Sequence, residues 1–322
     1  MYNFYITQDG TITREGNTLY FIGPDFKRHL PVMNVQEIII SAKVSLSSWA
    51  LDYLSKLGII VHIISTNGKY MSSLIPGNRN ERGNTTVQQV KAYLSDKRFK
   101  IAAEMVNGIK NNILANLRYY SDNNEITKYI KAIESYNPDY NSNDINKILG
   151  VEGNIWSTYY SAFPFIYKKY PDFKREFYPP KDELNAMISY GNALLYATVL
   201  TKIFITGLNP SISFLHEPSE RSFSLALDIA DIFKPVIVER TIANLVNKNI
   251  MAHDSFRFED NGCYLSLNGR RKFIEYYNEK LNTVIKIGNN YLSYNNIIER
   301  EAYNLLNAIR NDEDYKSFRS RS

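Results

Sequence analysis

The chain has 322 residues, 44% of them hydrophobic, which is enough to bury a sizeable core in roughly two domains. The formal net charge of +5 at pH 7 permits a polyanionic partner such as nucleic acid without requiring one. A single cysteine, Cys263, excludes an internal disulfide framework and a zinc site built from several cysteines.

The start of the chain and its apolar runs bear on where the protein resides. Met1 to Thr7 lack a charged segment followed by an apolar one, so we expect no signal peptide. Runs such as Ile59 to Ile64 fall short of the roughly 20 apolar residues that a membrane span requires. We therefore expect a cytoplasmic protein with no membrane partner.

The first 77 residues have the pattern of a small β-rich domain. Short segments of β-branched and aromatic residues are separated by turn dipeptides such as Asp9-Gly10, which predicts a small antiparallel sheet. One helix interrupts the sheet, because Leu46 to Leu57 carry an apolar stripe at helical spacing. Further on, Asn67-Gly68 predicts a hairpin.

A linker is predicted at residues 78–86, around the stretch PGNRNERGNT, because proline, glycine, asparagine and charged residues dominate it. Beyond it the apolar residues recur at helical spacing, and residues 186–206 indicate a long apolar helix at the centre of a helical domain. The basic tail, residues 316–322, is expected to be mobile. The predicted fold class is α+β, with a small N-terminal β-rich domain followed by a larger all-α C-terminal catalytic domain at residues 87–322.

The stretch FLHEPSERSFSLALDIADIFKP, residues 214–235, sets a histidine and two aspartates around one predicted helix. Asp228 and Asp231 are expected one turn apart on the same face. Two carboxylates held that close repel each other, so the pair either faces solvent or binds something positive. With His216, such oxygen ligands would suit manganese or magnesium. A solvated aspartate pair is the commoner arrangement, and a metal site needs a third ligand that this stretch does not supply.

Three sequence blocks, in this order, resemble a known family. They are GVEGNIWSTYY at residues 150–160, PPKDELNAMISYGNALLYA at 179–197, and GLNPSISFLHEPSERSFSLALDIADIFKP at 207–235. The family is that of the CRISPR-associated endonuclease and integrase, the Cas-one family, which acts in spacer acquisition for antiviral defence. Its layout of a β-rich front half and a helical back half is similar to the one predicted here.

The resemblance implies a metal centre at named positions. In the family, a glutamate, a histidine and an acidic residue bind the catalytic metal ion, and by position these are Glu152, His216 and Asp231. The implied cofactor is a divalent ion, Mn²⁺ or Mg²⁺. Asp228 matches a neighbouring aspartate that is either a secondary ligand or a supporting partner. Lys234 stands where the family often has arginine.

The resemblance also implies an activity on double-stranded DNA. The 3′-hydroxyl of a DNA fragment would join a repeat of the CRISPR array by transesterification, and water in its place would give endonuclease activity. The protein would be a homodimer through its N-terminal domain, with two dimers bridged by a dimer of the small Cas-two protein. Lys234, Arg240 and Lys248 follow the metal site on the same predicted helical region, and they are our candidates for contacts to DNA phosphates.

Two alternatives stay open. The first is an unrelated metal-dependent nuclease that cuts DNA without joining it. The second is a non-catalytic DNA-bridging scaffold whose acidic cluster is structural. Joined products in a strand-transfer assay would separate an integrase from both.

Overall fold

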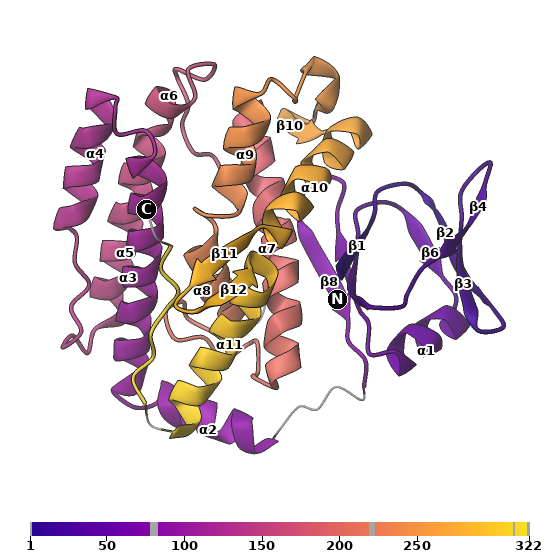
Figure 1. Cartoon of the computed structure of the whole chain (residues 1–322), viewed down its shortest axis with the longest axis horizontal. Helices are drawn as coiled ribbons and strands as arrows, with labels where there is room; N and C mark the ends of the chain where they lie inside the picture. Colours follow the sequence, from indigo (N-terminus) through magenta and orange to yellow (C-terminus); the bar gives the residue numbers. More distant parts are fainter. Residues whose placement is uncertain (1, 78–82, 219–222, 312, 321–322) are drawn as a thin grey trace.

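The computed structural model describes residues 2–77, 83–218, 223–311 and 313–320. A β-rich N-terminal part lies at one end, and a larger, mainly helical part forms the rest (Figure 1). The α+β class is therefore confirmed. The boundary between two domains stays a prediction, since residues 78–82 of the predicted linker lie outside the described residues and residues 83–86 begin a helix.

The N-terminal part contains two four-stranded sheets, ordered β1-β5-β7-β8 and β4-β3-β2-β6. The prediction of one small antiparallel sheet is wrong, because β1 pairs parallel with β5, β5 with β7, and β2 with β6. The chain leaves the first sheet after β1 and builds most of the second before returning as β5, and such a long crossover allows parallel neighbours. The elements are β1 (Tyr2–Ile6), β2 (Gly10–Glu15), β3 (Thr18–Ile22), β4 (Lys27–Leu30), β5 (Val35–Ile40), β6 (Val44–Leu46), α1 (Ser48–Lys56), β7 (Ile60–Ile64) and β8 (Tyr70–Leu74).

The central strand β5 is buried on both faces and connects the two parts of the molecule. Ile38 and Ile40 belong to a small core between the sheets, whereas Ile39 belongs to the main core of the helical part. Buried polar contacts reinforce this junction, since the Glu37 carboxylate accepts a hydrogen bond from Thr198 at 3.0 Å. The first sheet is therefore held firmly to the helices that carry the pocket described below.

The helical part also contains two β-hairpins, so the prediction of an all-α C-terminal domain is wrong. In the first hairpin Asp260 and Asn261 have positive φ angles of 49° and 59°, a turn geometry that these residue types tolerate. The elements are α2 (Gly83–Tyr93), α3 (Lys97–Arg118), α4 (Asn124–Ser135), α5 (Ile145–Ser161), α6 (Phe163–Ile166), α7 (Glu183–Thr206), α8 (Ser224–Phe233), α9 (Val238–Asn247), η1 (His253–Ser255), β9 (Phe256–Glu259), β10 (Gly262–Leu265), α10 (Leu267–Asn282), β11 (Val284–Ile287), β12 (Asn290–Ser293) and α11 (Tyr294–Asn311).

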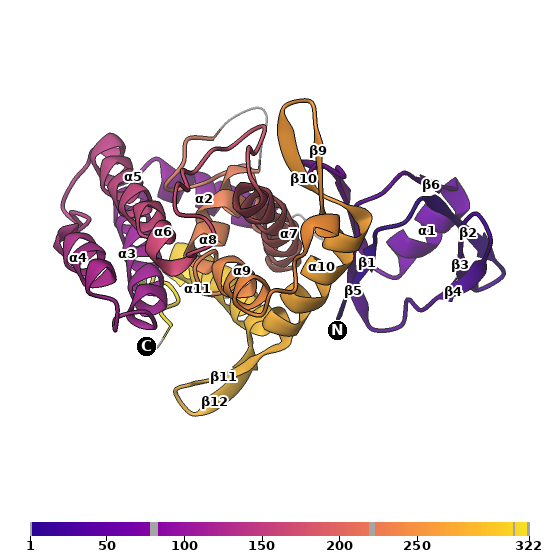
Figure 2. The ribbon, with the colours of Figure 1, turned by 90° about the horizontal axis from the view of Figure 1, so that it is seen from above.

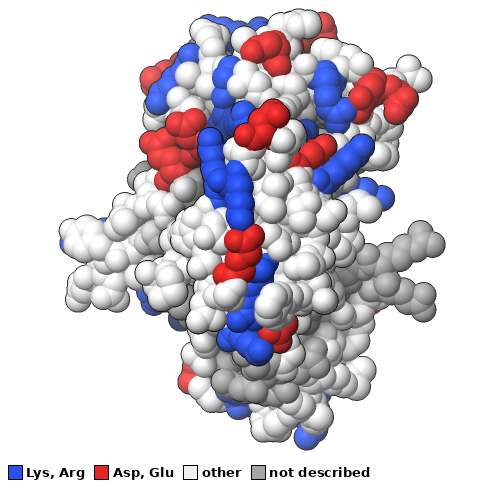
Figure 3. All heavy atoms as spheres, turned by 90° about the vertical axis from the view of Figure 1, so that its right-hand side faces the viewer, with Lys and Arg blue, Asp and Glu red and all other residues white. Residues whose placement is uncertain are grey.

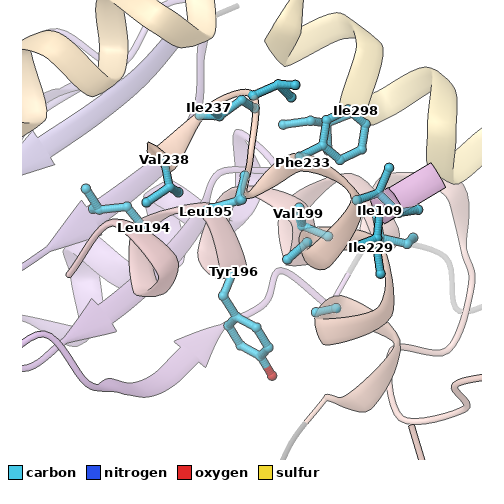
Figure 4. Packing of buried hydrophobic residues seen from close by; sticks show 14 of the residues in the cluster. Ile109, Leu194, Leu195, Tyr196, Val199, Ile229, Phe233, Ile237, Val238 and Ile298 are labelled. Atoms are coloured by element: carbon cyan, nitrogen blue, oxygen red, sulfur yellow. The ribbon is translucent and has the colours of Figure 1, made fainter. Parts of the chain in front are cut away.

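Helix α7 is the central helix, as the sequence predicts. Seen from above, α8, α9 and α10 lie around it (Figure 2). Its Val199 shares one packed cluster with Ile229 and Phe233 of α8 (Figure 4). By length and composition α7 could also span a membrane, but 78% of its most apolar stretch is buried inside the protein, as in a core helix.

The C-terminal tail is held in place over residues 313–320, so the expectation of a mobile tail is wrong there. The Phe318 ring stacks on Phe233 with ring centroids 5.3 Å apart, and the Phe318 N–H donates to Glu301 at 3.1 Å. Ser317 N–H donates to the Glu104 carboxylate at 3.2 Å. The tail therefore covers the end of α8.

Candidate catalytic pocket

A pocket of about 640 Å³ opens in the helical part, and its walls come from α5, α7, α8 and the loop before α7. Glu152 of α5, His216 of the segment before α8, and Asp231 of α8 all line it. Lys234, at the C-terminal end of α8, lines it as well. The structure thus brings together the three residues that the resemblance implied as metal ligands.

Helix α5 places Glu152 at the border of a buried face. Asp144 caps this helix, because its side chain accepts a hydrogen bond from the Asn146 N–H at 3.0 Å. Ile148 and Ile155 are buried in the main core, and Glu152 lies between them at helical spacing. Its carboxylate therefore reaches the pocket from a helix that is fixed by core packing.

Asp228 is fully buried and does not line the pocket. Its Oδ2 accepts hydrogen bonds from the N–H groups of Phe214 at 2.7 Å and Leu215 at 3.0 Å. Its Oδ1 accepts the N–H of His216 at 3.0 Å and lies 2.8 Å from the Nδ1 of the same residue. Asp228 thus fixes the imidazole orientation and leaves Nε2 as the ring nitrogen suited to metal coordination.

Asp231 points into the pocket, although only 4% of the residue is exposed. Its carboxylate forms an ion pair with Lys234, one turn further along the chain. The Lys234 ammonium also lies 5.6 Å from the centre of the Trp156 ring. A positive charge is therefore part of the pocket wall.

Burial and neighbouring charges shift the pKa values of the pocket residues. Burial, together with the negative charge of Asp231, raises the pKa of Glu152 to about 7. Burial opposes the charged form of His216, but the hydrogen bond and charge of Asp228 outweigh it and raise the pKa of His216 to about 9. A carboxylate whose pKa is raised by the negative charge of a neighbour is stabilised in its ionised form by a cation bound nearby.

The donor types in the pocket fit a divalent cation. Among the described residues no group of three His, Cys, Asp or Glu side chains lies close enough together, as placed, to hold a metal ion. Even so, two carboxylates and one imidazole face the same pocket, and these are ligands that Mn²⁺ and Mg²⁺ accept. Binding would require Glu152, His216 and Asp231 to draw closer together.

Sequence analysis missed several residues that line the pocket. Lys174, Arg175 and Phe177 come from the loop before α7, and Asn192 comes from α7 itself. The Arg175 guanidinium lies 4.6 Å from the centre of the Phe177 ring and donates to the Asn185 side chain at 2.9 Å. Two signals were present: an aromatic and basic run before Pro179-Pro180, and a polar residue within an apolar helix.

Two of the predicted DNA contacts lie away from the pocket lining. Arg240 donates to the Ala115 carbonyl of α3 at 3.2 Å and stacks on Tyr119 at 4.8 Å. Lys248 lies 5.8 Å from the centre of the Tyr276 ring. On the face of the molecule that Figure 3 shows, Lys and Arg are interspersed with Asp and Glu. Of the three candidates, the pocket contains Lys234.

Known proteins resemble this chain along nearly its whole length. Residues 4–279 match the family model described as CRISPR associated protein Cas1. The chain is 38% identical over 326 residues to CRISPR-associated endonuclease Cas1 3 of Thermodesulfovibrio yellowstonii, which covers 99% of both chains. It is 39% identical over 286 residues to CRISPR-associated endonuclease Cas1 of Methanothermobacter thermautotrophicus, covering 88% of this chain and 84% of that one.

Solved structures have the same fold. A Cas1 protein from Thermotoga maritima superposes with a TM-score of 0.87 at 30% identity, covering 99% of this chain and 100% of that one. A casposase bound to its integration product superposes with a TM-score of 0.86, covering 98% of this chain and 93% of that one, and at 22% identity this shows the fold alone. Fold, pocket and relatives place the chain among the CRISPR-associated proteins. Within them it belongs to the Cas1 family, the Cas-one family of the sequence resemblance.

Proposed function

We propose that the chain is a metal-dependent DNA endonuclease and integrase, which joins the 3′-hydroxyl ends of DNA fragments to a CRISPR repeat array. The observation that carries the proposal is the convergence of Glu152, His216 and Asp231 on one pocket. These residues come from separate elements, so their convergence is a property of the fold. Relatives named CRISPR-associated endonuclease support a nuclease activity for this chain.

Glu152, His216 and Asp231 would hold a divalent ion, Mn²⁺ or Mg²⁺. When bound, such an ion supplies charge stabilisation at the scissile phosphate and helps to activate the attacking group. Asp228 takes no direct part in this scheme. It holds the imidazole of His216 in a fixed orientation, which is the role of a supporting partner rather than of a ligand.

The remaining pocket residues position the DNA. Lys234, Lys174 and Arg175 supply positive charge near the carboxylates and would contact phosphate oxygens. The Trp156 and Tyr160 rings are stacked with centroids 5.5 Å apart and form an apolar wall. Phosphodiester transfer needs little covalent help from a protein, so positioning and charge are the main contributions of these residues.

The proposed partners are double-stranded DNA, a second copy of the chain, and a Cas2 dimer that bridges two such dimers in the cytoplasm. A chain of a Cas6-RT-Cas1--Cas2 complex has the same fold over part of its length, with a TM-score of 0.85 at 18% identity, covering 99% of this chain and 36% of that one. The N-terminal part also exposes large apolar side chains, including Met33 at 74% and Trp49 at 61%. Exposed apolar residues of this size are typical of subunit contacts.

Strand transfer tests the proposal against its two alternatives. A labelled duplex with free 3′-hydroxyls is incubated with a repeat-bearing plasmid, Cas2 and Mn²⁺, using wild type and His216→Ala. Joined products from wild type alone support the integrase. Cut ends without joined products would favour a nuclease that only cuts. DNA binding without product in any divalent ion would favour a non-catalytic scaffold.

A further inference from the structure

Asn192 is a polar residue within the apolar central helix, and it lines the catalytic pocket. It comes from α7, whereas the three proposed metal ligands come from α5, α8 and the segment before α8. Residues on both sides of it, Gly191 and Ala193, are buried in the protein interior. Asn192 is therefore a polar group that α7 presents to the reaction site.

The side-chain oxygen of Asn192 is buried and has no hydrogen-bond partner among the described residues. Asn185 on the same helix provides a contrast. Its oxygen accepts from Arg175 at 2.9 Å and from the Glu176 N–H at 3.0 Å, and its nitrogen donates to the Lys174 carbonyl at 2.8 Å. Leaving a buried acceptor unsatisfied costs about 1–3 kcal/mol. An unmet acceptor at a pocket wall is a position where a bound ligand or a water molecule can supply the donor.

Tight packing beside Asn192 fixes its position. A Cβ atom added to Gly191 would lie 2.6 Å from a methyl carbon of Val238 and 2.8 Å from the Phe273 ring. Helix α7 therefore approaches α9 and α10 too closely to rotate or slide at this point. Asn192 is held toward the pocket by the packing of its neighbour, which is the kind of rigid support that catalytic groups require.

The chemistry of the acceptor narrows the groups that it can bind. A carbonyl oxygen accepts hydrogen bonds only from groups that carry hydrogen. In phosphodiester transfer the oxygens of the scissile phosphate carry none at neutral pH, whereas the attacking hydroxyl carries one. We propose that Asn192 is a catalytic residue whose side-chain oxygen binds and orients the attacking 3′-hydroxyl, or the attacking water in hydrolysis.

This inference rests on the proposed function and specifies one step of it. The attacking oxygen forms a bond to phosphorus while the bond from phosphorus to the leaving 3′-oxygen breaks. The proton of the attacking hydroxyl passes to bulk water, and the leaving oxygen takes up a proton. Asn192 accepts a hydrogen bond from the nucleophile and so directs an oxygen lone pair at phosphorus.

The experiment compares Asn192→Leu, which keeps the shape and removes the acceptor, with Asn192→Asp, which keeps an acceptor oxygen. Strand-transfer rate is measured at saturating DNA and Mn²⁺, alongside the Kd for DNA and the shift in Tm that Mn²⁺ produces. The leucine variant is expected to react about 100-fold more slowly, with the Kd and the Mn²⁺-induced shift unchanged. The aspartate variant is expected to react faster than the leucine variant.

Ser189→Ala is the matched control. Ser189 lies one turn earlier on α7, and its hydroxyl is also buried with no hydrogen-bond partner in the part of the chain that the structure describes, but it does not line the pocket. This variant should react at the wild-type rate. If Asn192→Leu and Ser189→Ala lost activity equally, the cause would be a disturbed helix and the inference would be overturned. Should Asn192→Leu fail to fold, as judged by its Tm, Asn192→Ala replaces it in the same comparison.

Other outcomes separate the inference from the proposed function. If wild type is active and Asn192→Leu is equally active, the inference is overturned but the proposed function stands. An aspartate variant as slow as the leucine variant would assign the effect to the amide N–H groups, which also overturns the proposed acceptor role. A wild-type protein that yields no product with Mn²⁺ or Mg²⁺ overturns the proposed function and this inference together.

Discussion

The Nδ1 atom of His216 lies 2.8 Å from Oδ1 of Asp228, a carboxylate that also accepts three backbone N–H groups of residues 214–216. One buried side chain therefore holds both the histidine ring and the segment that carries it. Asp228 is placed to orient a metal ligand, and its loss should affect the reaction through His216.

Asp228→Asn tests this relationship. The asparagine amide keeps the size of the carboxylate, but it carries no charge and only one of its two terminal atoms, the oxygen, can accept hydrogen bonds. We expect the pKa of His216 to fall, since the hydrogen bond and charge of Asp228 are the main influences that raise it. Metal affinity or activity should drop about 10–100-fold, as is typical for partners of metal-ligating histidines. An NMR titration of the metal-free protein and a strand-transfer assay give the two values.

The control for this variant is Glu217→Gln, an exposed neighbour of His216 that is ion-paired with Arg98. It should leave both the pKa of His216 and the rate unchanged. A normal rate and an unchanged pKa in Asp228→Asn would contradict the supporting role of Asp228.

Glu239 offers a test of stability against pH. It is fully buried and neither of its carboxylate oxygens has a hydrogen-bond partner within the described structure. Burial raises its pKa to about 8, although Arg175 and Lys234 act to lower it. The folded state thus binds the Glu239 proton more tightly than the unfolded state does. This contribution to stability is fully present below pH 4.5, the ordinary pKa of glutamate, and is lost as pH rises to about 8.

Glu239→Gln should remove that dependence. We expect the variant to be more stable than wild type at pH 8, by about 1–3 kcal/mol, because no buried charge then has to form. The advantage should shrink at pH 5, where Glu239 is protonated in the folded wild type. Urea unfolding at both pH values measures the difference. If the free energy of unfolding depended on pH equally in wild type and Glu239→Gln, Glu239 would be solvated or paired in solution.

Local patterns in the sequence predicted much of the helical part but little of the strand pairing. Residues 186–206 indicated a buried central helix, and α7 spans Glu183–Thr206. Residue preferences indicate where strands form but not which strands pair, so the order of the two sheets could not be read from them. The hairpin β9-β10 was not predicted, although the Asp260-Asn261 turn that closes it is a local signal.

The residues of the pocket could likewise be predicted only in part. The spacing of Asp228 and Asp231 on one predicted helix is confirmed by α8, but spacing alone could not show that one supports His216 while the other faces the pocket. Glu152 lies 64 residues before His216, and no local periodicity brings them together. The family resemblance placed Glu152, whereas Asn192 and Arg175 became visible only through tertiary packing.

The C-terminal tail should stabilise the end of α8. Phe318 is 9% exposed and stacks on Phe233, two residues after Asp231. Phe318→Ala should lower the free energy of unfolding by about 3–5 kcal/mol, the usual loss for a buried phenylalanine. Chemical denaturation measures the change. Lys316→Ala is the control, because Lys316 is exposed in the same segment and its removal should change stability by less than about 0.5 kcal/mol. A Phe318→Ala protein as stable as this control would show that the tail does not pack in solution.

The loop before α7 should contribute to DNA binding through charge. Lys174 lines the catalytic pocket, so we expect Lys174→Ala to weaken DNA binding similarly for all sequences. Loss of one phosphate contact lowers the magnitude of the slope of log K against log salt concentration by about 1. Binding titrations at several salt concentrations measure this slope. Lys248, which lies outside the pocket lining, was predicted from the sequence to contact DNA phosphates. Lys248→Ala tests that prediction in the same way. A reduced slope in Lys248→Ala but not in Lys174→Ala would place the DNA path along α9 and away from the loop.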